Sequence, residues 1–202
     1  RSLKDFDLLP TEPDWAGGLK ERWSPGEAGA AKRLKDFLKS DLEAYADERN
    51  RLASDGTSHL SPHLRFGEIS PRTILAETKA VETRKSAQGA KTFLSEIGWR
   101  EFDYHVLHYH PDVAEKNLHD KFDKMGWGKP KASDLEAWQR GQTGYPIVDA
   151  GMRQLWQTGY MHNRVRMLTA SFLIKDLLCD WRIGEKWCWD CLCDADPATK
   201  SL

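Results

Sequence analysis

Residues 159–167 read Gly159-Tyr160-Met161-His162-Asn163-Arg164-Val165-Arg166-Met167, and they place polar side chains at the start of an apolar helix. From Val165 onward, apolar residues recur at helical spacing, namely Leu168, Phe172, Leu173, Leu177 and Leu178. The sequence therefore predicts a buried helix whose first turns carry Asn163, Arg164 and Arg166 into a site. Amides and guanidinium groups suit a ligand with phosphates, carboxylates or heteroaromatic edges. Taken alone, the stretch also fits a helix start held by ordinary ion pairs.

The composition is that of an ordinary single domain. The chain has 202 residues with 30 basic and 31 acidic side chains, a net charge of -1. Any contact with DNA must therefore come from a local basic patch. The nine tryptophans can fill a core or stack on planar ligands. No apolar run reaches the roughly 18 to 20 residues of a membrane span, and the amino terminus lacks a signal-peptide core, so we expect a soluble intracellular protein.

Helical signals dominate the chain and alternating strand patterns are scarce, so the sequence predicts an all-α fold. We expect helices over residues 30–51, over 87–110 before Pro111, from a capping box of Ser133 and Glu136, and from Pro146 to Gly159. A long polar connection should run from 111 to 133. Residues 1–26 are rich in proline and glycine and are interpreted as a linker or surface arm. The helical domain would then occupy 27–202.

Two further groups of residues are candidates for a site. Gly56-Thr57-Ser58, followed by Leu60-Ser61-Pro62, offers hydroxyls and amides that suit phosphate oxygens, or an ordinary helix cap. In that segment, His59 and His63 are interpreted as loop and helix-surface residues. Glu96, Trp99 and Arg100 are spaced i, i+3 and i+4 and so share one helical face. They could equally be a tryptophan at the core boundary beside an exposed ion pair.

We expect no metal site. Cys179, Cys188, Cys191 and Cys193 lie close together, but zinc sites need a second ligand pair after a longer insert. The alternative is a set of small buried residues in a tryptophan-rich helix. Asp194 and Asp196 by themselves form only an acidic turn.

Five blocks in one order carry a resemblance to a known family: residues 56–70 (GTSHLSPHLRFGEIS), Trp99-Arg100-Glu101-Phe102, residues 143–150 (TGYPIVDA), Met161-His162-Asn163-Arg164 and Asp194-Ala195-Asp196. Together they resemble the flavin-binding helical domain of the photolyase and cryptochrome family. The resemblance runs from about residue 34 to residue 196 and is more specific than one short motif. It implies an all-α FAD domain that lacks the family's α/β antenna domain.

The resemblance implies FAD as cofactor and a set of residues that hold it. Residues 56–61 would cradle the diphosphate and ribityl chain, with Tyr45 closing over it. Arg166 would pair with Asp194 beside the isoalloxazine and hold compensating charge next to a reduced flavin. The full set implied for FAD is Tyr45, Thr57, Ser58, His59, Leu60, Ser61, Arg100, Asn163, Arg166, Asp194, Ala195 and Asp196.

The resemblance also implies a substrate, UV-damaged DNA that contains pyrimidine dimers. Photolyases extrude the damaged bases from the duplex. The residues implied for substrate binding are Glu96, Trp99, Arg100, Asn163, Arg164 and Met167. Glu96 and Asn163 would take part in the reaction, and Trp127 and Trp181 would be the outer and middle members of an electron-transfer chain. Asn163 and Met167 favour the cyclobutane-dimer photolyases; a cryptochrome-like photosensor and an inactive fragment stay as alternatives.

The sequence departs from the family pattern at both ends. From the resemblance we expect no antenna domain in residues 1–202, and this sequence ends shortly after Asp196, before the position expected for the innermost tryptophan of the electron chain. Lys200 stands where photolyases carry an asparagine that faces the flavin. We therefore expect a domain that is incomplete at its carboxyl end, with weakened FAD binding and slow photoreduction. We further expect a monomer, in the bacterial cytoplasm or a eukaryotic nucleus.

Overall fold

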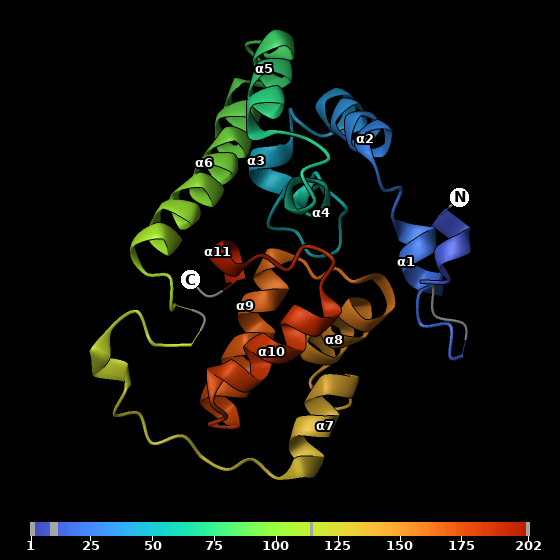
Figure 1. Cartoon of the computed structure of the whole chain (residues 1–202). Coiled ribbons are helices and arrows are strands. Elements are labelled where there is room, and N and C mark those ends of the chain that lie inside the picture. The colour runs from blue at the N-terminus through green and yellow to red at the C-terminus, as the bar shows by residue number, and fades with distance from the viewer. Residues whose placement is uncertain (1–2, 9–11, 114, 201–202) are drawn as a thin grey trace.

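Every regular element is helical in residues 3–8, 12–113 and 115–200, the part of the chain that the computed structural model describes (Figure 1). The first half contains η1 (Leu3–Phe6), α1 (Gly17–Arg22), α2 (Glu27–Ser40), α3 (Tyr45–Glu48), α4 (Ser61–Arg65), α5 (Pro71–Val81) and α6 (Ala87–Tyr109). The second half contains η2 (Asp120–Phe122), α7 (Ala132–Arg140), α8 (Pro146–Thr158), α9 (Asn163–Ser171), the π-helix η3 (Phe172–Asp176), α10 (Trp181–Cys191) and α11 (Pro197–Lys200). The all-α prediction is confirmed.

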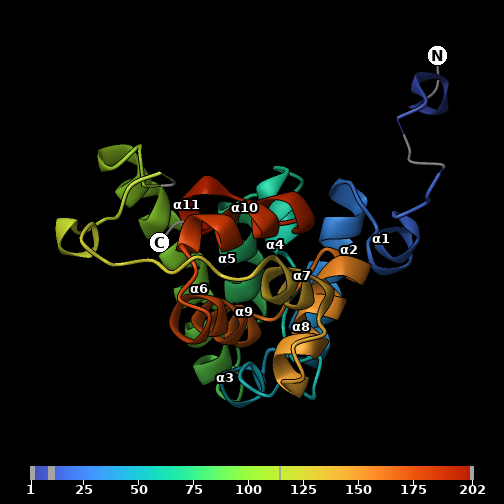
Figure 2. The same ribbon diagram turned by 90° about the horizontal axis from the view of Figure 1, so that it is seen from below.

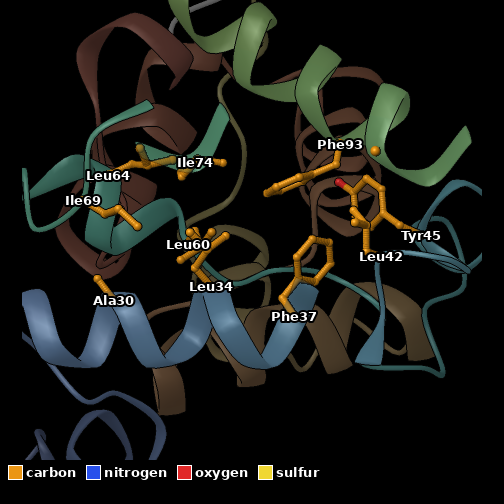
Figure 3. Packing of buried hydrophobic residues seen from close by; sticks show 11 residues of the cluster. Ala30, Leu34, Phe37, Leu42, Tyr45, Leu60, Leu64, Ile69, Ile74 and Phe93 are labelled. Carbon is orange, nitrogen blue, oxygen red and sulfur yellow. The ribbon is translucent and has the colours of Figure 1, made fainter. Parts of the chain in front are cut away.

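The first half of the chain builds one hydrophobic core between α2 and α6 (Figure 3). Phe37 of α2 and Phe93 of α6 meet with ring centroids 4.6 Å apart, and Tyr45 packs edge-on against both rings. Leu34 and Leu60 fill the space beside them. Removing these large side chains from water is the main force that holds the first half together.

The second half builds a separate core from α7, α8, α9, η3 and α10. Trp138 of α7 is 1% exposed, and its indole N–H donates to the carbonyl of Thr169 at 3.1 Å. Gly151 of α8 lets α9 approach closely, since a Cβ there would lie 2.3 Å from a Val165 methyl carbon. Figure 1 shows this group of helices beneath α2–α6, with α11 between the two groups. Two cores in one chain leave a seam, and the candidate site lies in it.

Several helix ends follow from local chemistry, as the sequence predicts. Pro146 begins α8, and Gly159 ends it in a left-handed conformation with φ 65°. The long helix expected over 87–110 is α6, and it ends before Pro111. The capping box expected at Ser133 is wrong: α7 begins one residue earlier, and the Ser133 hydroxyl donates to Asp134 Oδ1 at 3.2 Å.

The single helix expected over residues 30–51 is also wrong. Helix α2 ends at Ser40, and the chain turns before α3. The turn presses the Leu42 carbonyl onto Gly89 of α6, where a Cβ would lie 1.7 Å from that oxygen. A straight helix would keep Leu42 and Tyr45 from the α6 contact, whereas the turn buries both.

The helix after Asn163 is buried less evenly than its pattern predicts. Val165 and Leu173 are buried, but Leu168 and Leu178 are 42% and 50% exposed. Leu168 lies on the solvent side of α9, and Leu178 follows the end of the π-helix η3 at Asp176, in a left-handed conformation with φ 49°.

The first 26 residues contain more structure than the linker that we expected. Helix α1 packs against α8 (Figure 2), and the indole of Trp23 donates to the Thr158 carbonyl at 2.7 Å. Ala16 is 6% exposed. The domain boundary at residue 26 stays a prediction.

Candidate functional site

A cavity of about 430 Å³ lies between the two cores. Its wall comes from α3, the loop before α4, α6, the start of α9 and the turn before α11. The lining residues are Tyr45, Arg49, Asn50, Thr57, Ser58, His59, Leu60, Ser61, Leu64, Arg65, Phe93, Glu96, Ile97, Trp99, Arg100, Asp103, Tyr160, Met161, His162, Asn163, Arg164, Arg166, Asp194 and Asp196. The volume is within the range of ordinary small-molecule sites.

The fold brings nearly all of the predicted site residues to this wall. Among those expected to hold FAD, only Ala195 is outside it; its carbonyl instead accepts a hydrogen bond from Arg65 Nε. Among those expected to bind substrate, only Met167 is outside; it is 56% exposed, with its sulfur 3.6 Å from Arg164 Nη1. Residues up to 151 positions apart along the chain, Tyr45 and Asp196, thus face one space.

One polar feature of the cavity is a pair formed by Arg166 and the buried Asp194. Arg166 Nη2 donates to Asp194 Oδ2 at 2.7 Å, and Arg166 Nε donates to the Met161 carbonyl at 2.7 Å. The Asp194 side chain is 5% exposed. Its Oδ1 is buried and has no hydrogen-bond partner among the described residues. Because a buried unpaired oxygen is unfavourable, this atom is suited to an N–H donor of a ligand.

His162 caps helix α9 at the edge of the cavity. Its Nδ1 accepts from the Arg164 N–H at 3.1 Å, and its Nε2 lies 2.9 Å from the Arg49 carbonyl. Both contacts are satisfied by a neutral ring with the proton on Nε2. Burial is the main cause that lowers the pKa of His162. The hydrogen bond to the Arg49 carbonyl raises this pKa, but nearby guanidinium groups, above all that of Arg164, lower it again.

At the mouth of the cavity lies the face of α6 that contains Glu96, Trp99 and Arg100. Glu96 and Arg49 form an ion pair at 2.5 Å, while Trp99 is 61% exposed and packs edge-on against Phe102. The prediction that Glu96, Trp99 and Arg100 share one face is confirmed, since all three line the cavity. An exposed indole at such a mouth offers a flat surface to a planar group.

The loop before α4 also lines the cavity, through Thr57, Ser58, His59 and Leu60. The Thr57 hydroxyl lies 3.3 Å from the Tyr160 hydroxyl. His59 lies in the loop, as expected, although it is buried at 5% exposed. The helix-surface position expected for His63 is wrong, since His63 is 4% exposed. Each buried imidazole contacts a carboxylate, His59 with Asp55 and His63 with Glu68. The interior accepts these rings because the carboxylates satisfy their polar atoms.

Sequence reasoning missed Arg49, Tyr160 and Arg65 in the cavity wall. Arg49 stands four residues after Tyr45, so helical spacing could have indicated it. In the structure, its guanidinium carbon lies 5.7 Å from the centre of the Tyr45 ring. Burial raises the pKa of Tyr45 to about 12, so its hydroxyl stays protonated at neutral pH.

Trp127 and Trp181 are not in the cavity wall. The indole of Trp181 donates to Asn117 Oδ1 at 2.9 Å, and the Arg182 guanidinium lies 4.7 Å from the Trp181 ring centre. After Trp127, the Gly128 N–H donates to the Leu178 carbonyl at 2.8 Å, which ties the long connection to the end of η3. Their electron-transfer roles stay predictions. The side chain of Lys200 lies outside the described residues.

The cavity therefore defines a class of site: a helical pocket with a hydroxyl-bearing loop, a buried arginine–aspartate pair and an aromatic mouth. Such a pocket suits a large ligand that joins phosphates to a planar heterocycle. The chain belongs to the family described as the FAD binding domain of DNA photolyase, which matches residues 93–202. FAD is the cofactor of this family.

Individual relatives agree with the family match. The chain is 52% identical over 199 residues to a deoxyribodipyrimidine photo-lyase of Agrobacterium fabrum, covering 98% of this chain and 41% of the relative. It is 40% identical to Cryptochrome-2 of Arabidopsis thaliana, covering 88% of this chain and 30% of the relative. A solved bacterial class III photolyase from Agrobacterium tumefaciens superposes with a TM-score of 0.94 at 52% identity, covering 100% of this chain and 42% of that one.

The chain thus spans about two fifths of the length of the photolyases that it matches most extensively. Among the described residues, no helix combines the length and the apolar character needed to cross a membrane.

Proposed function

We propose that the cavity binds FAD noncovalently and that the chain serves in the light-driven repair of cyclobutane pyrimidine dimers in DNA. One observation carries the proposal: a single cavity joins the buried Arg166–Asp194 pair, the Thr57–Ser61 loop and the exposed indole of Trp99. A cofactor site and a platform for a planar substrate then share one wall. The names of the photolyase relatives support this combination.

The residues present fit FAD. The unpaired Asp194 Oδ1 would accept from an N–H of the flavin ring, and Arg166 would balance negative charge beside a reduced flavin. The hydroxyls of Thr57, Ser58 and Ser61 would donate to phosphate oxygens. Tyr45, a neutral phenol at neutral pH whose pKa burial raises further to about 12, would contact the cofactor without adding charge. Bound and reduced, FAD supplies the light-excited electron that opens a cyclobutane ring.

The mouth of the cavity would receive the extruded dimer. Flipping a base out of a duplex costs a few kcal/mol, least where the step is already damaged. A stacked aromatic returns about 1 to 3 kcal/mol per base. Trp99 could therefore nearly balance the flip of a lesion but not of an intact pair. Glu96 and Asn163 would bind the base edges, and Arg164 would hold a nearby phosphate.

Further parts of the proposal concern electron supply and setting. Trp127 and Trp181 would pass electrons toward the flavin from the surface. DNA as substrate implies the compartment that holds DNA, the cytoplasm of a bacterium or the nucleus of a eukaryote. The chain would act as a monomer, which light scattering after size exclusion would test.

The first experiment is a titration of the folded 202-residue chain with FAD, followed by calorimetry and by quenching of flavin fluorescence. Heat and quenching are expected; the absence of both would contradict the proposal and leave an inactive fold. The second compares binding to matched duplexes with and without a dimer. Equal affinity would remove the repair function.

A cryptochrome-like photosensor is the second candidate, because cryptochromes are among the relatives. Exposure of the chain loaded with chemically reduced FAD to blue light, with dimer-containing DNA present, separates the two. Loss of dimers indicates repair; a light-induced change in the flavin spectrum without loss of dimers favours the photosensor.

A further inference from the structure

Helix α1 reaches the loop that lines the cavity through its last residue, Arg22. Arg22 Nη2 lies 3.3 Å from Asp55 Oδ1 and 3.0 Å from His59 Nε2. Asp55 and His59 also contact each other through Oδ1 and Nε2. With its proton on Nε2, the His59 ring donates to Asp55, and its Nδ1, 3.4 Å from Arg22 Nη2, is the acceptor for Arg22. One guanidinium therefore connects both ends of the segment 55–59, of which residues 57–59 line the cavity.

The backbone of this segment has an unusual conformation at His59. Its φ of 52° lies in the left-handed region, which residues other than glycine seldom adopt. Such a conformation persists only where the surroundings hold it. Here the imidazole is packed edge-on against Tyr160 at 4.7 Å and Trp23 at 6.3 Å, with the Arg22–Asp55 pair on its polar edge.

Helix α1 is itself firmly seated, so Arg22 extends from a fixed support. A Cβ at Gly18 would lie 2.0 Å from the Gln157 carbonyl oxygen, which shows how closely α1 approaches the end of α8. The Trp23 indole adds its hydrogen bond to the Thr158 carbonyl. Burial raises the pKa of the Asp55 carboxyl, but the contacts with His59 and Arg22 lower it by more, so the net pKa is below its ordinary value. Asp55 is therefore the anionic partner of Arg22 at neutral pH.

We propose that Arg22 is a positioning residue for the cofactor loop: through Asp55 and His59 it holds His59 in the left-handed conformation, which turns Thr57 and Ser58 toward the cavity. The expected effect of Arg22 on FAD affinity rests on the proposed function. The effect of Arg22 on the conformation of the loop does not rest on it, because that conformation belongs to the chain without ligand. Residues expected to be a linker would then take part in building the site.

The experiment compares the parent chain with Arg22→Met, His59→Gly and the double variant. Lys20→Met is the matched control, since Lys20 is on the same helix and its ion-pair partner within the described part of the chain is the exposed Asp14. The first readout is the NMR order parameter of the amides of residues 56–60 without ligand. In the parent and the control we expect values near 0.85, and in Arg22→Met values below about 0.6.

The second readout is the dissociation constant for FAD. Arg22→Met should raise it about 5- to 150-fold, the range set by the strain of one left-handed residue, and Lys20→Met should leave it unchanged. Glycine adopts a positive φ without strain. In the His59→Gly background, Arg22→Met should therefore raise the dissociation constant much less than in the parent.

The outcomes are distinguishable. If Arg22→Met leaves order parameters and affinity as the control does, the positioning role is refuted. An equal effect of Arg22→Met in both backgrounds refutes the action through His59. If the parent itself fails to bind FAD, the proposed function fails, while the order parameters still decide whether Arg22 holds the loop.

Discussion

Replacing Asp194 by asparagine should weaken FAD binding about 10- to 150-fold. The estimate comes from one atom, Asp194 Oδ1, which is buried and has no partner among the described residues. A hydrogen bond from a flavin N–H to this charged oxygen is worth about 1.5 to 3 kcal/mol, and the asparagine amide cannot supply a charged acceptor. The amide oxygen can still accept from Arg166, so the free energy of unfolding should fall by only about 1 kcal/mol.

The assay is calorimetric titration of folded protein with FAD, with urea unfolding of the ligand-free chain measured in parallel. Asp190→Asn is the matched control, because Asp190 is an exposed residue of α10 outside the cavity wall. The control should bind FAD as the parent does. If folded Asp194→Asn binds FAD within about twofold of the parent, Asp194 Oδ1 is not a cofactor acceptor and the assignment of the flavin to this end of the cavity is wrong.

Three other outcomes are expected. Trp99→Ala should weaken binding of dimer-containing DNA by about 1 to 3 kcal/mol without changing the salt dependence of that binding. Arg164→Ala should reduce the slope of log affinity against log salt concentration by about one unit, with little loss of discrimination between damaged and undamaged DNA. Binding isotherms at several salt concentrations decide both. In the folded state the pKa of His162 is lowered from its ordinary value of 6.5, so near that pH the folded chain binds fewer protons than the unfolded chain. The free energy of unfolding is therefore at its full value above about pH 6.5 and decreases as the pH falls from there through the folded pKa. His162→Asn keeps a capping acceptor without the titration, and urea unfolding between about pH 7 and 5 should show a flatter pH dependence; an unchanged dependence would exclude His162 as its source. Gly151→Ala should destabilise the chain by about 1 to 3 kcal/mol, because the added Cβ would lie 2.3 Å from a Val165 methyl carbon. Gly98→Ala, where the added Cβ has no neighbour within 4 Å, should stabilise the chain by about 0.5 to 1 kcal/mol. If thermal unfolding ranks the two variants otherwise, the close packing of α8 on α9 is contradicted.

Much of the site could be predicted because its residues stand in short local patterns. Glu96, Trp99 and Arg100 share a helical face by spacing alone, and that face does line the cavity. The Arg166–Asp194 pair was expected from the family resemblance, and the two atoms lie 2.7 Å apart. Met167 and Ala195 were expected by the same route but are outside the cavity wall, because adjacent positions on a turn or helix face different directions.

The sequence by itself determined the helical class, the ends of α8 at Pro146 and Gly159, and the length of α6, since these depend on residues a few positions apart. Only the tertiary structure decided that α2 stops at Ser40, because the cause is the close approach of Leu42 to Gly89, 47 positions away. The pairing of Arg22 with His59 and of Arg49 with Glu96 was likewise invisible, because each joins residues 37 and 47 positions apart and charge alone does not name a partner. Local patterns fix backbone preference, whereas burial, a left-handed histidine and an unpaired carboxylate oxygen arise only when distant segments pack into one interior.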